Sequence, residues 1–129
     1  DHVILKFILP RVKALRDLPP HATPSTMFTG EQMERSGRGE GLSAEEEEEG
    51  YQKWLSTLDK IILAISLYLD DEMFLKRDDQ GRVVYEGDQE TFATKITGKR
   101  GFPVEDPEKR RQFEEGWELF HKHFFSLYD

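Results

Sequence analysis

The sequence predicts a mainly α fold: a small helical domain of three principal helices with a β-hairpin insertion. Two segments place large apolar side chains at the i, i+3, i+4, i+7 spacing that gathers them on one helical face. These side chains are Trp54, Leu58, Ile61, Ile62 and Ile65 in the first segment, and Phe113, Trp117, Phe120, Phe124 and Leu127 in the second. Because both faces must be buried, we expect the two helices to pack on each other, on the N-terminal segment, or on a partner.

The N-terminal segment, residues 2–17, predicts the third helix. Its expected apolar side consists of Ile4, Phe7, Ile8, Val12 and Leu15. Pro10 must kink or divide this helix, because its ring blocks the hydrogen bond to the preceding turn. Residues 19–42 are rich in Pro, Thr, Ser and Gly and predict a long loop, with a short helical turn at 31–35. An irregular stretch of that length is expected to be mobile or functional.

The central helix begins with a strong signal. Ser43 followed by Glu46 forms a capping box, and the acidic run that follows suits the positive end of the helix dipole. Gly50 is a weak point rather than a stop, so we expect the helix to continue to about Leu69.

The last third of the chain alternates short elements. Residues 73–86 favour a β-hairpin around a Gly-containing turn, and residues 89–97 a short helix with Phe92 and Ile96. Residues 98–101 form a basic loop. Asp106 followed by proline predicts the start of the last helix.

Length and composition bound the function. The chain has 129 residues, no cysteine and a net charge of -8. We expect a single domain over residues 1–129, without disulfides or Cys-based metal sites. No apolar run approaches the roughly 20 residues of a membrane span, so no membrane partner is expected. The acidic charge argues against long nucleic acids. Since the chain begins with Asp1, we expect further residues ahead of it.

Local basic groups survive in this acidic chain and could hold a compact anion. Arg11 follows the helix-interrupting proline, and its guanidinium could bind a phosphate through two hydrogen bonds. Lys99 and Arg100 could close over the same anion from their glycine-flanked loop. Trp54 either packs in the core or stacks on a base. Asp59 belongs to a surface charge pair with Lys60 or anchors a neighbouring helix end.

Catalytic and metal sites are disfavoured. His121 and His123 are two residues apart on a helix, point in different directions and are expected at the surface. The carboxylates at 70–72 lack a calcium-loop spacing, and we expect a solvated helix end there. No phosphate-binding P-loop or nucleophile elbow occurs. The chain is therefore expected to have no catalytic residues, metal or cofactor.

Three blocks of the sequence resemble a widespread group of small proteins of tailed bacteriophages. They are Leu9-Pro10-Arg11-Val12-Lys13, then Trp54 with Leu58-Asp59-Lys60-Ile61-Ile62, then Gly116-Trp117-Glu118-Leu119-Phe120 with Lys122 and Phe124. Together the blocks cover roughly 50 residues, and their order carries the resemblance more than any single block. Trp117, His123 and Tyr128 depart from the usual pattern, which has Leu, Tyr and Trp there.

The resemblance implies a phage accessory protein in the cytoplasm of the infected bacterial host. Our first hypothesis is anti-defence: a homo-oligomer that sequesters a small nucleotide-derived immune signal, such as a cyclic ADP-ribose species or cyclic dinucleotide, without catalysis. Its expected ligand-binding residues are Arg11, Trp54, Asp59, Lys99 and Arg100. The alternative is a protein-interaction module that inhibits a host protein through an apolar helix face or the acidic run. An enzyme is the least favoured of the three.

Overall fold

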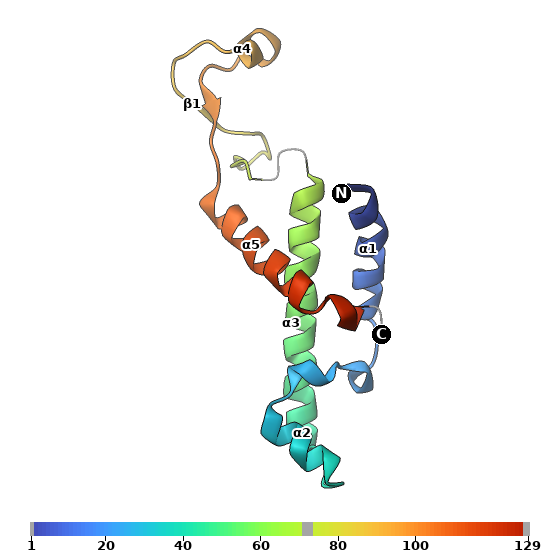
Figure 1. Cartoon of the computed structure of the whole chain (residues 1–129). Helices are drawn as coiled ribbons and strands as arrows, with labels where there is room; N and C mark the ends of the chain where they lie inside the picture. Colours follow the sequence, from blue (N-terminus) through green and yellow to red (C-terminus); the bar gives the residue numbers. More distant parts are fainter. Residues whose placement is uncertain (1, 71–73, 128–129) are drawn as a thin grey trace.

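Three long helices dominate the computed structural model, which describes residues 2–70 and 74–127 (Figure 1). They are α1 (His2–Leu15), α3 (Ala44–Leu69) and α5 (Pro107–Lys122). Both α1 and α5 pack on α3, which is the central element of the fold. The predicted mainly α fold is confirmed.

The core lies where α1 and α5 meet α3. Trp54 retains only 4% of its surface, and Leu58, Ile61 and Ile65 are fully buried below it on the same face of α3. Phe120 from α5 completes this layer. The apolar stripe that the sequence placed on α3 is thus the one that holds the domain together.

The apolar side of α1 differs from the expected one. Ile8, Val12 and Leu15 are buried as expected, with Leu5 in line with them, whereas Ile4 is 57% and Phe7 80% exposed. The helix is apolar on most of its circumference, so periodicity alone does not tell which side packs. Contact with α3 selects the seam 5, 8, 12, 15, whose three- and four-residue steps match a straight helix–helix contact.

Pro10 neither divides α1 nor ends it. The helix runs through Pro10 to Leu15, two residues short of the expected end. Pro10 lies on the exposed side, where water can solvate the carbonyl group that its missing N–H leaves without a partner.

The expected loop at 19–42 contains regular structure. Two 3₁₀ turns, η1 (Pro20–Ala22) and η2 (Ser25–Met27), precede the helix α2 (Gly30–Gly37). A capping box between Thr29 and Gln32 starts α2. The segment crosses the first half of α3 (Figure 1), where Phe28 packs so closely on Gly50 that a Cβ there would lie 2.3 Å from its ring.

The start of α3 is as predicted. Ser43 Oγ accepts a hydrogen bond from the Glu46 N–H at 3.1 Å, and the Glu46 carboxylate accepts one from the Ser43 N–H at 3.1 Å. Glu46 also binds Arg35 and, at 3.0 Å, the amide of Gln32. The Arg35 guanidinium and the capping N–H lower the pKa of Glu46 to about 2. One carboxylate therefore caps α3 and fastens α2 to it.

Residues 74–106 form a small module at the end of the helices (Figure 1). The described part of the expected hairpin, residues 74–86, turns at 78–82 and pairs Arg77 with Val83. The two-stranded antiparallel sheet is different: β1 (Tyr85–Glu86) pairs with β2 (Phe102–Pro103), which the sequence did not predict as a strand. The short helix α4 (Phe92–Thr97) lies between them and exposes Phe92 and Ile96.

The last helix starts as predicted but ends early. Asp106 caps α5 by accepting a hydrogen bond from the Glu108 N–H at 3.0 Å. The helix ends at Lys122, and the chain continues as the 3₁₀ turn η3 (Phe124–Leu127), where a continuous helix was expected. The tighter turn carries Leu127 into the core beside α1, where its side chain is fully buried.

Within the described ranges, none of the helices combines the length and apolar character needed to cross a membrane.

Candidate functional site

A pocket of about 460 Å³ lies where the middle of α3, the end of α5 and the stretch from η2 to Thr29 come together. Three lysines reach it, Lys53 and Lys60 from α3 and Lys122 from α5. Residues 26–29 also line the pocket. A volume of this size is in the usual range for small-molecule sites.

The α3 wall of the pocket is one helical stripe. Lys53, Ser56, Thr57 and Lys60 follow the i, i+3, i+4, i+7 spacing and so share a face, next to the apolar stripe. Thr57 donates its hydroxyl hydrogen to the Lys53 carbonyl oxygen at 2.9 Å, which fixes that hydroxyl group. The two lysines lie two helical turns apart, about 10 Å along the axis, and can reach opposite ends of a ligand.

The α5 wall contributes Lys122 and His123. His123 was expected at the surface, but it is only 3% exposed, because the change from α5 to η3 turns its ring inward. The imidazole packs edge-on against the indole of Trp54, with ring centres 6.0 Å apart. Burial, and then the charge of Lys122, lower the pKa of His123. The imidazole is therefore neutral at pH 7 and its Nδ1 is buried without a hydrogen-bond partner among the described residues.

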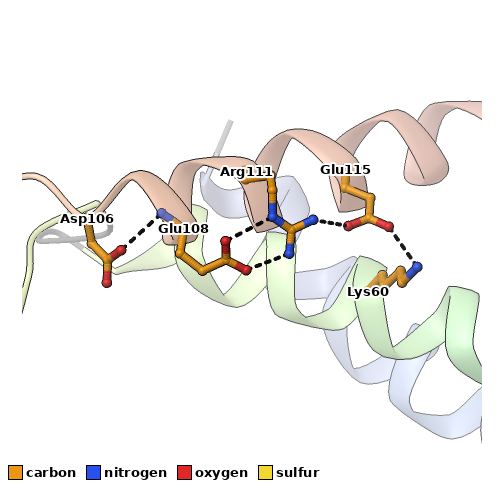
Figure 2. A network of polar contacts seen from close by, with 5 residues as sticks. All are labelled: Lys60, Asp106, Glu108, Arg111 and Glu115. Carbon is orange, nitrogen blue, oxygen red and sulfur yellow. Dashed lines mark hydrogen bonds and ion pairs between the residues drawn. The ribbon is translucent and has the colours of Figure 1, made fainter.

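The charge of Lys60 is balanced by a network along α5 (Figure 2). Lys60 binds Glu115 at 2.7 Å, Glu115 binds Arg111 at 3.0 Å, and Arg111 also pairs with Glu108. The side-chain bond from Lys60 lowers the pKa of Glu115, and that from Arg111 lowers the pKa of Glu108. Two cations and two carboxylates alternate, so the network holds the Lys60 ammonium group in place without adding net charge.

The positive charges of the other two lysines, Lys53 and Lys122, are balanced less by neighbouring carboxylates. Lys53 is 3.7 Å from Glu49, an exposed pair of little strength. The side-chain ammonium group of Lys122 makes no hydrogen bond or ion pair with any residue in the described ranges. The pocket therefore carries a net positive charge in a chain of net charge -8. Lys122 is the group best able to bind an incoming anion.

Two of the residues singled out in the sequence support the core. Arg11 donates a hydrogen bond from Nε to the Leu127 carbonyl oxygen at 3.3 Å, linking α1 to η3. Trp54 is buried in the core and its remaining surface borders a separate pocket of about 260 Å³ beside Leu15 and Ser126. That geometry agrees with core packing, the first of its two interpretations.

The other three lie elsewhere. Lys99 donates to the Val83 carbonyl oxygen at 2.9 Å, and Arg100 pairs with Glu90 at 3.0 Å, both within the module beyond the helices (Figure 1). Asp59 binds Arg16 at 3.1 Å, so it anchors the chain just after α1, as one of its two interpretations had it. None of the five expected ligand residues lines the pocket of Lys53, Lys60 and Lys122.

Sequence reasoning missed this pocket. A signal existed in the polar stripe Lys53, Ser56, Thr57, Lys60, which runs beside the apolar stripe of α3. Its partner Lys122 is 62 residues after Lys60, and only the crossing of α5 over α3 brings the two together. Of the carboxylates expected at a solvated helix end, those at 71 and 72 lie outside the described residues. Over the described ranges, no cluster of three or more His, Asp or Glu side chains is arranged to hold a metal ion.

Searches against protein families, curated proteins and solved structures found no match to this chain.

Proposed function

We propose that this protein is a binding protein that captures a small, phosphate-bearing, nucleotide-derived ligand in the pocket between α3 and α5. The observation that supports it is the convergence of three lysines from two helices on one pocket of about 460 Å³. Ammonium groups form charge-assisted hydrogen bonds with phosphate oxygens, and such bonds are stronger than those between neutral groups.

The parts of the pocket have distinct roles in this proposal. Lys122 binds the first anionic group, because it has no partner to give up within the described residues. Lys60 is held by Glu115 and supplies a positioned positive charge. His123 borders the pocket with its largely buried ring, and the hydroxyl group of Ser56 offers a hydrogen-bond donor to the ligand's polar edge.

Capture without turnover is the simplest chemistry for these groups. Catalysis by a nucleophile or general base requires a base that a third group orients. His123 has a lowered pKa and, among the described residues, no carboxylate partner. These features support binding, and the setting we propose is sequestration of an immune signal in an infected bacterial cell, on the resemblance of three sequence blocks to phage proteins.

Calorimetric titration tests the proposal. The ligands are cyclic ADP-ribose, ADP-ribose, a panel of cyclic dinucleotides and inorganic phosphate. We expect at least one nucleotide to bind, and Lys122→Gln to weaken it about tenfold or more, the cost of one charge-assisted hydrogen bond. Lys95→Gln is the matched control, because Lys95 is exposed on α4, away from the pocket. It should bind as the wild type does.

The contradicting results are equally clear. Folded wild-type protein that binds none of these ligands would remove the proposal. Equal losses in Lys122→Gln and Lys95→Gln would show that the overall charge matters and the pocket does not. Release of a chemically altered nucleotide would replace capture by catalysis.

A further inference from the structure

A second apolar seam runs along the outer side of α1. Val3, Phe7, Pro10 and Ala14 follow one another at steps of four, three and four residues, and all four are exposed. This is the heptad spacing with which one helix packs along another. The buried seam of α1, at positions 5, 8, 12 and 15, has the same kind of spacing and faces α3. The helix is thus built to pack on two sides, and α3 covers one of them.

Phe7 is the largest side chain of the outer seam and is more exposed than Val3. Phe7 is 80% exposed, although a phenyl group is among the side chains that gain most from burial. Pro10 and Ala14 are small and leave room for a partner to approach the second half of the helix. α1 has 14 residues and is about 21 Å long, which matches three turns or more of a partner helix.

Cations line both edges of the seam. Lys6 and Lys13 directly precede Phe7 and Ala14, and Arg11 directly follows Pro10. α1 contains no Asp or Glu in its described residues. Lys6 and Lys13 make no ion pair with the rest of the described chain. These positions correspond to those beside a coiled-coil seam, where charges select the partner.

We propose that the outer face of α1 docks an amphipathic helix of another protein, with an apolar seam flanked by Asp and Glu. The charge pattern disfavours α1 of a second copy as the docked helix, because Lys6 and Lys13 of each copy would line the same seam and repel one another. It also decides against a broad anionic surface such as a lipid bilayer, which the acidic remainder of the chain would oppose. This docking site is separate from the lysine pocket and does not depend on it.

The test uses two synthetic helical peptides of about 21 residues, three heptads each. Both carry Leu and Ala at the seam; one has Glu and the other Lys at every flanking position. Fluorescence anisotropy of each labelled peptide is followed against the whole protein. We expect the Glu-flanked peptide to bind at least tenfold more tightly than the Lys-flanked one, and added salt to reduce the difference.

Variants at exposed positions keep the fold and make the test specific. Phe7→Asp should abolish binding of the Glu-flanked peptide, and Phe92→Asp should not, although Phe92 is 79% exposed and similarly apolar. The double variant Lys6→Glu with Lys13→Glu should reverse the preference and bind the Lys-flanked peptide. That gain of binding could not result from a damaged fold.

Three results would overturn the inference. The first is equal binding of the two peptides, or binding of neither. The second is a dimer of the wild-type protein, measured by light scattering, that Phe7→Asp converts to a monomer. The third is Phe7-dependent sedimentation with phosphatidylglycerol vesicles in the absence of peptide binding, which would assign the face to a lipid surface.

Discussion

Gly116 of α5 lies directly against the backbone of α3 at Lys60. A Cβ placed on Gly116 would be 2.2 Å from the Lys60 carbonyl oxygen and 2.6 Å from the Cβ of Ala64. Only a hydrogen atom fits in that space. This contact sets how closely α5 crosses α3, and therefore where Lys122 and His123 stand relative to Lys60.

Adding a side chain at this crossing should destabilise the domain. Gly116→Val must push the two backbones apart, and overpacking of this kind costs about 1–3 kcal/mol or more. Urea unfolding followed by circular dichroism measures the loss. Gly37→Ala is the control, because a Cβ at Gly37 meets nothing within 4 Å. If Gly116→Val were as stable as the wild type, the close crossing of α5 and α3 would be wrong.

Truncating Trp54 and Phe7 should have opposite consequences, because only the first is buried. Trp54→Ala removes a large core side chain and should cost about 3–5 kcal/mol of unfolding free energy. Phe7→Ala should change it by less than about 0.5 kcal/mol, as is usual for exposed positions. If both variants lost the same free energy of unfolding in urea, Phe7 would have to be buried, which would contradict the observed packing side of α1.

Acid should loosen the junction of α2 and α3 through Glu46. Its pKa is lowered from an ordinary 4.5 to about 2, so its contacts contribute fully above pH 4.5 and are lost as the pH falls toward 2. Thermal melting between pH 6 and pH 2.5 should show less pH dependence in Glu46→Gln than in the wild type. Glu45→Gln, in the same helical turn, should keep the wild-type slope. If the melting temperatures of all three proteins depended equally on pH, the ionisation of Glu46 would not contribute to stability and the prediction would be wrong.

Buried His123 should make stability fall on mild acidification. Its folded-state pKa lies below the ordinary 6.5, so the unfolded chain binds more protons there. Stability is therefore complete above about pH 6.5 and decreases as the pH falls below it. His123→Phe keeps a ring beside Trp54. In this variant the midpoint of urea unfolding should change less between pH 8 and pH 5 than it does in the wild type. His121→Gln removes an exposed imidazole and should keep the wild-type dependence of the urea midpoint on pH. If His121→Gln reduced that dependence and His123→Phe did not, the buried ring would be that of residue 121.

The sequence predicts the fold best where a local signal acts alone. Ser43 with Glu46 and Asp106 with Pro107 mark helix starts by hydrogen bonds within a few residues, and both starts are observed. Thr29 and Gln32 form the same kind of capping box at the start of α2, of which the sequence predicts only a short turn at 31–35. The packed side of α1 could not be predicted, because that helix has two apolar seams and only α3 distinguishes them.

The candidate site is less accessible to sequence reasoning. The sequence-based hypothesis places Arg11, Lys99 and Arg100 in one site because all three are basic. In the structure each binds a different neighbour, which is Leu127, Val83 and Glu90 respectively. Charge type does not determine proximity. Lys60 and Lys122 line the same pocket because Gly116 lets α5 approach α3 closely, and this long-range contact cannot be read from a local sequence pattern.

The most direct test of the account is to locate the bound ligand by NMR. Backbone and Trp indole resonances of the ¹⁵N-labelled protein are followed while the tightest-binding nucleotide is added. We expect the largest shift changes at Ser56, Lys122 and His123, and none at Lys99 and Arg100. Changes confined to the loop at 98–101, or no change anywhere at saturating nucleotide, would contradict the assignment of the lysine pocket as the binding site.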